Sequence, residues 1–239
     1  MFIAEIGINH KGSEEKAWSI LKKLIQTNVD AITFQIPKPE FYAEVTKWGN
    51  KLSNEFYEKA INFVHKNKKL IGFAIADENM IQFLDDNGAD FWKSASVYIN
   101  DTTLQSKLQS TNKITFVSTG ISDDEEIINV GETLKNIKFI HTQLTDKLEE
   151  TNLKAIANIK KITDKDVAFG LHCSNVLALY LSVVFEPSDF FVYVKEDNKE
   201  EYPDDVHAIL TEDLNDVVYT LNTIKKSLGS GKKEKVIQN

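Results

Sequence analysis

The 239-residue sequence contains no arginine, so all 28 of its cationic side chains are lysines. Any anionic ligand must therefore be held by lysine, by backbone N–H groups or by a metal ion, without the planar fork that arginine offers to carboxylates and phosphates. The net charge is −8. Because phosphate backbones select basic surfaces, this acidic excess argues against a nucleic-acid partner.

Cysteine is almost absent as well. The single cysteine, Cys173, cannot form an internal disulfide, which favours a reducing cytoplasm. The N-terminus lacks the basic, apolar and small-residue pattern of a signal peptide, and no apolar run approaches the roughly 20 residues that span a bilayer. We therefore expect a cytoplasmic protein with no membrane partner.

The sequence does contain a repeated rhythm of short apolar runs and helical stretches. Because these runs are rich in β-branched or aromatic residues and too short for typical helices, they predict buried parallel strands. The eight runs are Phe2–Ile6, Ala31–Gln35, Leu70–Ile75, Phe91–Ser94, Ile114–Ser118, Lys138–Thr142, Val167–Leu171 and Phe190–Val194. Between them, apolar residues recur at helical spacing, most clearly from Ala17 to Ile25, from Phe56 to Val64 and from Leu153 to Ile159.

Alternating strands and helices predict an α/β fold with a parallel sheet, and eight units in this length predict a closed (β/α)8 TIM barrel. The alternative is an open doubly wound sheet, but no G-x-G-x-x-G pattern follows the first run. We expect the barrel over residues 1–228 and a flexible, glycine- and lysine-rich tail over 229–239. Two helix starts are expected: Ser13 as a cap on its own, and Ser122 with Glu125 as a capping box.

In such a barrel the active site lies at the carboxyl ends of the strands. Glu5 interrupts the first apolar run, where a carboxylate must be paired or hydrated. Lys93 ends the fourth run, where it can bind an anion, form a Schiff base or pair with Glu5. Both residues are therefore candidates for chemistry, and a structural ion pair between them is the alternative.

His141, His172 and Cys173 stand at or just beyond the ends of the sixth and seventh runs. Histidine and cysteine near one another can bind zinc or iron. Their spacing is not a strong metal signature, so a hydrogen-bonded histidine in the barrel mouth is the favoured interpretation.

Two segments form specific motifs, Ile3-Ala-Glu-Ile-Gly-Ile-Asn-His-Lys-Gly12 and Val117-Ser-Thr-Gly-Ile121. Weaker matches follow the same order at Asp30–Gln35, Trp92–Ser96, Phe139–Thr142 and Pro203-Asp204. Together they resemble the N-acetylneuraminate (sialic acid) synthase family along nearly the whole chain. Relatives in that family make legionaminic and pseudaminic acids or act in spore-coat polysaccharide synthesis.

The resemblance implies a condensation in which phosphoenolpyruvate attacks the aldehyde of an N-acyl-mannosamine-type sugar, water adds and phosphate leaves. A divalent metal, manganese or magnesium, would act as the Lewis acid. Carried over by motif, the catalytic candidates are Glu5, Lys93 and Asp204, and the substrate-binding candidates are Asn9, His10, Gln35, Ser96, Ser118 and His141. The family also implies a homodimer with a small antifreeze-like C-terminal domain, which we expect to be missing here.

The sequence departs from the family pattern at its metal ligands. Ser174 stands where a metal histidine is expected, His172 holds the position of a serine, and Val192–Glu196 gives no clear match to the second metal histidine. Either His172 with Cys173, His141 or His207 rebuilds a metal site, or the condensation is lost. Two hypotheses stay open: a diverged synthase of nonulosonic acid or surface polysaccharide biosynthesis, and a non-catalytic homologue that binds a sugar or anion or supports a synthase partner. In either case we expect little turnover in a standard manganese assay.

Overall fold

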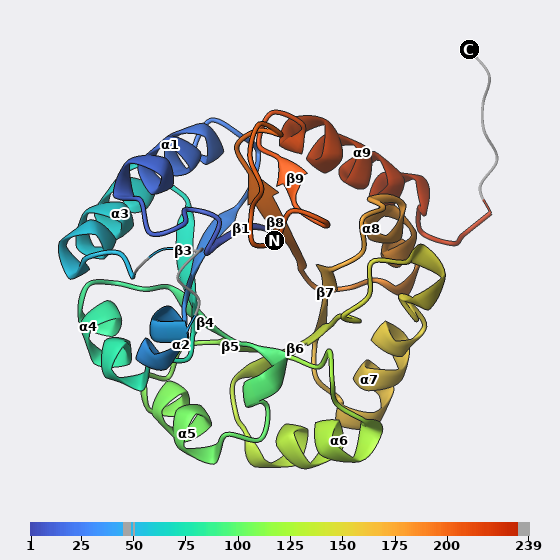
Figure 1. Cartoon of the computed structure of the whole chain (residues 1–239). Coiled ribbons are helices and arrows are strands. Elements are labelled where there is room, and N and C mark those ends of the chain that lie inside the picture. The colour runs from blue at the N-terminus through green and yellow to red at the C-terminus, as the bar shows by residue number, and fades with distance from the viewer. Residues whose placement is uncertain (45–48, 50, 234–239) are drawn as a thin grey trace.

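The computed structural model describes residues 1–44, 49 and 51–233. Eight parallel strands follow one another in sequence order, and β1 pairs with β8, so the sheet closes on itself (Figure 1). The strands are β1 (Phe2–Gly7), β2 (Ala31–Ile36), β3 (Leu70–Ile75), β4 (Phe91–Ser94), β5 (Thr115–Ser118), β6 (Ile137–His141), β7 (Val167–Leu171) and β8 (Phe190–Lys195). The predicted TIM barrel is confirmed, and each strand boundary lies within one residue of its prediction.

Helices form the outer ring of the barrel. They are α1 (Glu14–Leu24), α3 (Asn54–Lys66), α4 (Ile81–Asp86), α5 (Thr102–Ser110), α6 (Asp124–Thr133), α7 (Ala155–Thr163), α8 (Leu177–Ser182) and α9 (Leu214–Ser227). The three helices predicted from periodicity correspond to α1, α3 and α7. Within the described ranges, no helix combines the length and apolar character that crossing a membrane would require.

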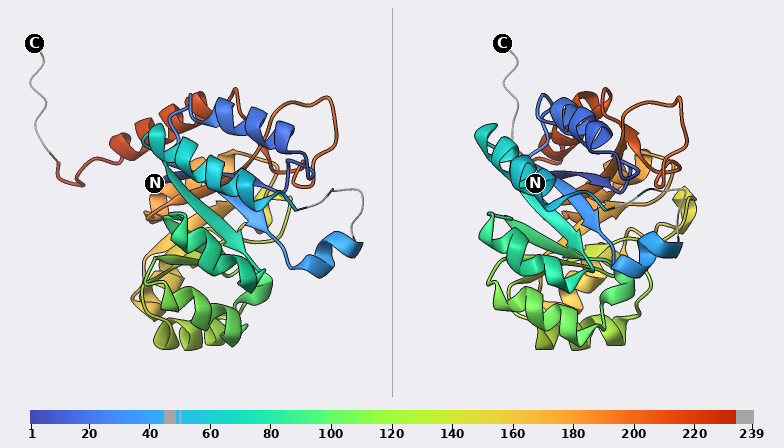
Figure 2. Two further views of the ribbon diagram at one scale, coloured as in Figure 1. Left: turned by 90° about the vertical axis from the view of Figure 1, so that its left-hand side faces the viewer. Right: turned by 60° about the vertical axis from the view of Figure 1, so that its left-hand side comes forward.

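Two elements that the sequence did not predict lie at the carboxyl ends of the strands. Helix α2 (Pro39–Glu44) follows β2, and the two-residue strand β9 (Ile209–Leu210) pairs in parallel with β8. Figure 2 shows α2 and the loop of residues 196–208 beyond the carboxyl ends of the strands. Of the expected tail 229–239, residues 229–233 are exposed and form no helix or strand, and residues 234–239 lie outside the described part of the chain.

One of the two predicted helix caps needs correction. Ser13 caps α1 alone, since its hydroxyl accepts the N–H of Lys16. The capping box of α6 is formed by Asp123 and Glu126, one residue later than predicted. Both registers fit the sequence pattern because aspartate caps a helix as well as serine does.

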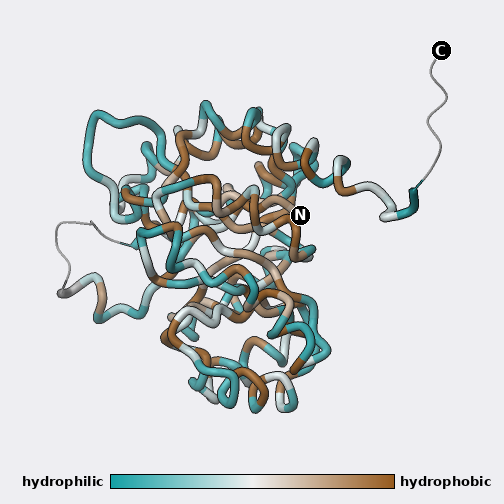
Figure 3. The backbone as a smooth tube through the Cα atoms, turned by 90° about the vertical axis from the view of Figure 1, so that its right-hand side faces the viewer, coloured by the Kyte–Doolittle hydropathy of each residue, from teal (hydrophilic) through white to brown (hydrophobic). Residues whose placement is uncertain are grey.

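The core has an inner and an outer layer. The inner layer fills the barrel with Ile3, Ala31, Phe91, Phe116, Ile140, Ala168 and Phe191. A Cβ at Gly72 would lie 2.3 Å from the Phe91 ring, so only glycine leaves room for this ring. The outer layer packs the other strand faces against the helices. In Figure 3 the 196–208 loop is largely hydrophilic. The inner layer, an aromatic plug, fills the barrel below the carboxyl ends of the strands.

Candidate functional site

A buried ion pair lies at the centre of the barrel mouth. Strand alternation places Glu5 and Lys93 one layer above the aromatic plug, and Lys93 Nζ lies 2.5 Å from Glu5 Oε2. Their side chains are only 3% and 6% exposed. The ammonium group also lies 5.3 Å from the centroids of the Phe191 and Tyr193 rings. The ion pair between Glu5 and Lys93, which the sequence left open as the alternative, is therefore present.

The second acid, Asp204, reaches the mouth on the 196–208 loop. Asn9 braces this loop, since its side chain donates to the Val194 carbonyl at 2.8 Å and accepts the Asp204 N–H at 3.1 Å. Lys195 adds an ion pair with Asp205 at 2.8 Å. Asn9 is fully buried, so the structure places this predicted substrate-binding residue where it positions Asp204.

Gly7 permits the close approach of this loop. Its φ is +57°, in the left-handed region that disfavours other residues. A Cβ there would lie 2.8 Å from Tyr193 Cε1 and 3.1 Å from Asp204 Oδ2. A side chain at this position would therefore displace both residues from the mouth.

Two histidines lie beside Asp204. His207 Nε2 is 3.8 Å from Asp204 Oδ1, and the His172 ring stacks on the His207 ring at a centroid distance of 4.6 Å and an angle of 32°. The Tyr193 ring contacts both histidines edge-on, at 5.5 and 5.1 Å. Asp204 Oδ2 and His207 Nε2 are shielded from solvent and have no hydrogen-bond partner within the described structure.

Burial sets the protonation of this cluster. It raises the pKa of Asp204 to about 7, helped by the negative charge of Glu5 and opposed by Lys93. It lowers the pKa of His207 to about 4 and that of His172 to about 3, because a charged imidazole loses its hydration there. At neutral pH both histidines are therefore neutral, and Asp204 carries a proton in a large fraction of molecules.

The predicted anion-binding residues lie at the ends of neighbouring strands. Ser118 ends β5, and Ser96 begins the 3₁₀ turn after β4. Both are buried, and the Ser96 hydroxyl accepts the Gly120 N–H at 2.9 Å. Gln35 lies near the end of β2 and is partly exposed. Together with Lys93, these residues give one side of the mouth a lysine and two hydroxyl groups.

Two predicted substrate-binding histidines face the outer layer. His141 Nε2 lies 3.0 Å from the Thr151 carbonyl, and its ring packs 6.3 Å from Phe169, a member of the outer core. His10 is buried, and its Nδ1 accepts the Gly12 N–H at 3.0 Å. The prediction that His141 is hydrogen-bonded is confirmed, but the expectation that its ring opens onto the mouth is wrong, because its position in β6 points outward with Phe139.

The structure does not bring the predicted metal pair together. His172 faces the mouth, whereas Cys173 packs in the outer core and hydrogen-bonds the Asn175 carbonyl at 3.3 Å. Ser174 is exposed, and its hydroxyl donates to the Asp146 carbonyl at 3.1 Å. In the part of the chain that the structure describes, no three His, Cys, Asp or Glu side chains are arranged to hold a metal ion.

Tyr193 was not among the predicted site residues, and His207 was considered only as a possible metal partner. The alternation of β8 could have found Tyr193, because it shares the inward face with Phe191 and its Cα is the register partner of Glu5. No local pattern identifies His207, since it lies in an irregular loop whose path depends on the contacts of Asn9 and Lys195. The inward tyrosine and this histidine complete the wall around Asp204.

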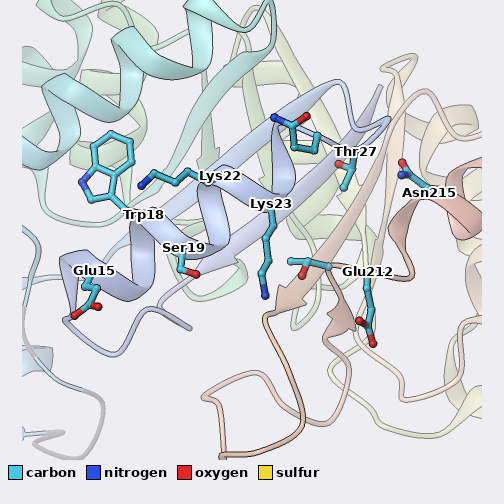
Figure 4. Close-up of a pocket in the computed structure, with 10 residues that line it drawn as sticks. Glu15, Trp18, Ser19, Lys22, Lys23, Thr27, Glu212 and Asn215 are labelled. Carbon is cyan, nitrogen blue, oxygen red and sulfur yellow. The ribbon is translucent and has the colours of Figure 1, made fainter.

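A separate cavity of about 850 Å³ lies outside the barrel, between α1 and the start of α9 (Figure 4). Its lining includes Trp18, Lys22 and Lys23 of α1 and Glu212 before α9. Lys23 pairs with Glu196 at 2.8 Å. The lining contains none of the predicted site residues, so we place the candidate site in the mouth.

Comparison with known proteins agrees with this fold. A family model described as the NeuB family matches residues 20–233. The chain belongs to the NeuB family. It is 26% identical to a pseudaminic acid synthase of Campylobacter jejuni over 99% of this chain and 78% of that protein. It is 28% identical to an uncharacterised protein of Methanocaldococcus jannaschii over 97% of this chain and 72% of that protein.

Among solved structures, a sialic acid synthetase from Leptospira borgpetersenii, crystallised with citrate, superimposes with a TM-score of 0.89. The alignment covers 98% of this chain and 87% of that one at 21% identity. At this identity the likeness demonstrates the common barrel fold, and the family membership depends on the sequence match.

Proposed function

We propose that this NeuB-family protein condenses phosphoenolpyruvate with an N-acyl-mannosamine-type sugar, in nonulosonic acid or surface polysaccharide biosynthesis. The observation that carries the proposal is the buried Glu5–Lys93 pair in the mouth, flanked by Ser96 and Ser118. Family membership and the names of the synthase relatives support the reaction class.

In this proposal the lysine side of the mouth binds the anionic substrate. Lys93 acts as a point charge for the phosphate or carboxylate, and the hydroxyls of Ser96 and Ser118 serve as donors. Glu5 already neutralises Lys93, so a second cation is needed. Lys38 follows β2 and is suited to this, because its side chain is 41% exposed and its contact with Asp101 is long, at 3.5 Å.

Among the described residues, no three His, Cys, Asp or Glu side chains are arranged to hold the divalent metal that the resemblance implies. His172 and His207 lie close together, at a centroid distance of 4.6 Å, whereas Cys173 packs in the outer core. We therefore assign no step of the reaction to a bound metal.

The direct test is to incubate purified protein with phosphoenolpyruvate and N-acetylmannosamine or a related N-acyl sugar. Release of phosphate together with formation of an α-keto acid sugar is expected. If no sugar in a panel gives product while phosphoenolpyruvate still binds in calorimetry, the protein is the non-catalytic homologue and the proposed reaction is wrong.

Anion binding is tested separately. Lys93→Ala is expected to weaken phosphoenolpyruvate binding at least about tenfold, the equivalent of about 1.4 kcal/mol. The control is Lys113→Ala, because Lys113 forms an ion pair with Asp85 on the outside of the barrel. Unchanged affinity in Lys93→Ala, with both variants folded, would show that the anion binds elsewhere.

A further inference from the structure

A cavity of about 530 Å³ lies between the neighbouring helices α5 and α6 in the outer ring of the barrel (Figure 1). Cavities of this size commonly hold small molecules. Its apolar lining consists of Ile99, Val130 and Leu134, and most of the other lining residues carry hydroxyl or amide groups. Among the described residues that line it, Lys135 is the one charged residue and none is a carboxylate. This composition suits an uncharged ligand.

Gln105 of α5 lines this cavity and is only 3% exposed. Its Nε2 donates to Ser94 Oγ at 2.8 Å and to the Tyr98 carbonyl at 3.0 Å. Because a carbonyl oxygen only accepts hydrogen bonds, the Tyr98 contact fixes which end of the Gln105 amide is the nitrogen. The other end, Oε1, has no hydrogen-bond partner in the described part of the chain.

Gln109 lies one helical turn further along α5 and also lines the cavity. Its Oε1 accepts the backbone N–H of Lys135 at 2.9 Å, and this contact fixes the amide because an N–H only donates. Its Nε2 is shielded from solvent, as Gln105 Oε1 is, and has no partner among the described residues. A buried polar group without a partner costs about 1–3 kcal/mol. The wall therefore contains one acceptor and one donor that the described residues leave unused.

A secondary amide has the groups that complement this pair. Its N–H can donate to Gln105 Oε1, its carbonyl oxygen can accept from Gln109 Nε2, and its acyl methyl group can pack against Val130. An ammonium group has no acceptor, and an ionised carboxylate has no donor. Neither ion can therefore satisfy both glutamines.

We propose that the cavity between α5 and α6 is a second ligand site, which binds an amino sugar through its N-acyl group. Such a sugar combines a secondary amide with hydroxyl groups, and Thr102, Ser106, Asn129 and Thr133 supply hydrogen-bonding partners for these hydroxyls around the cavity. The site lies outside the mouth and is additional to the catalytic site. The choice of an amino sugar rests on the proposed function, whereas the binding of a secondary amide rests on the two glutamines.

The experiment is a methyl NMR titration of the full chain with N-acetylmannosamine. The methyl groups of Val130 and Leu134 report on the cavity, and those of Ile3 and Ile140 report on the interior of the barrel. Saturable shifts are expected at Val130 and Leu134. Mannosamine and mannose, which lack the acyl group, are expected to bind about tenfold more weakly or worse, because they leave at least one glutamine unpaired.

Two variants localise the binding. Ser106→Trp fills the cavity from an exposed position on α5, and Gln109→Glu keeps the oxygen that accepts the Lys135 N–H but removes the Nε2 donor. Each is expected to weaken binding about tenfold or more. Thr103→Trp is the matched control, because Thr103 is exposed on the same helix and does not line the cavity. Gln105 is left unchanged, since it also holds Ser94 beside Lys93. Circular dichroism checks that each variant folds.

Saturable shifts at Val130 and Leu134 that both cavity variants lose and Thr103→Trp keeps would support the proposal. Shifts at Ile3 and Ile140 alone would place the sugar in the mouth, which overturns the second site and leaves the proposed function intact. Equal affinity for N-acetylmannosamine and mannosamine would overturn recognition of the amide. No saturable shift at Val130 and Leu134 would likewise overturn the site. The proposed function is judged separately, by the phosphate-release assay.

Discussion

Replacing Asp204 by asparagine should make the protein more stable at alkaline pH. Burial raises the pKa of this carboxyl from 3.8 to about 7, so ionisation costs more in the folded state than in the unfolded chain. A raised pKa gives stability that is fully present below pH 3.8 and is lost as the pH rises to about 7. Asparagine has nearly the same shape and does not ionise, so the variant avoids this loss.

The size of this stability difference follows from the pKa shift of Asp204. At about 1.4 kcal/mol per pKa unit, the full effect is about 4 kcal/mol above pH 7. The side chain is 19% exposed, and part of the loss has already occurred at pH 5. We therefore expect the free energy of unfolding of Asp204→Asn, relative to wild type, to grow by about 2 kcal/mol between pH 5 and pH 8.

Urea unfolding at the two pH values measures this difference directly. Asp205→Asn is the matched control, since it removes the neighbouring carboxylate that Lys195 contacts at 2.8 Å, and it is expected to show no such growth. If Asp204→Asn gains nothing over wild type between pH 5 and pH 8, the carboxyl is not held in an environment that disfavours its charge.

Two further predictions concern the architecture of the mouth. Lys93→Ala leaves Glu5 buried without its partner and should lower the free energy of unfolding by about 3–5 kcal/mol. The double variant Glu5→Gln/Lys93→Met should recover most of this loss, measured by urea unfolding. Equal losses in the single and the double variant would show that the ion pair does not stabilise the site. Gly7→Ala should cost about 1–3 kcal/mol and weaken phosphoenolpyruvate binding, because its Cβ would meet Tyr193 at 2.8 Å. Gly229→Ala is the control, since Gly229 has a similar φ of +62° with nothing within 4 Å, and an equal cost in both variants would assign the effect to backbone strain alone.

The fold could be predicted because its signals are local. Each strand is a short apolar run, and each predicted helix has one apolar face, so the boundaries follow from patterns a few residues long. Helix α2 and strand β9 could not be predicted, because neither has a local pattern of its own. The two residues of β9 become a strand through their pairing with Val194 and Lys195.

The inner wall of the mouth was predictable only in part. Glu5 and Lys93 could be placed from the polar interruption of an apolar strand and from the strand order. The position of Asp204 depends on contacts between residues nearly 200 positions apart in the chain, such as its N–H bond to Asn9. Such long-range contacts cannot be predicted from the spacing of residues in the sequence. The motif therefore identified Asp204 as a candidate, but it could not show that His207 lies beside it.

The end of β7 shows how much depends on the direction of a side chain. His172, Cys173 and Ser174 are adjacent in the sequence, and their order alone does not show which side chain faces the mouth. Either the histidine or the cysteine could therefore be considered a metal ligand. In the barrel, alternation continues past the strand, so Gly170 and His172 face inward while Leu171 and Cys173 face the outer core. Moving a histidine by two positions keeps it on the inward face, whereas moving it by one would bury it among helices. His172 has therefore kept an imidazole in the mouth, where its ring lies against that of His207 at a centroid distance of 4.6 Å.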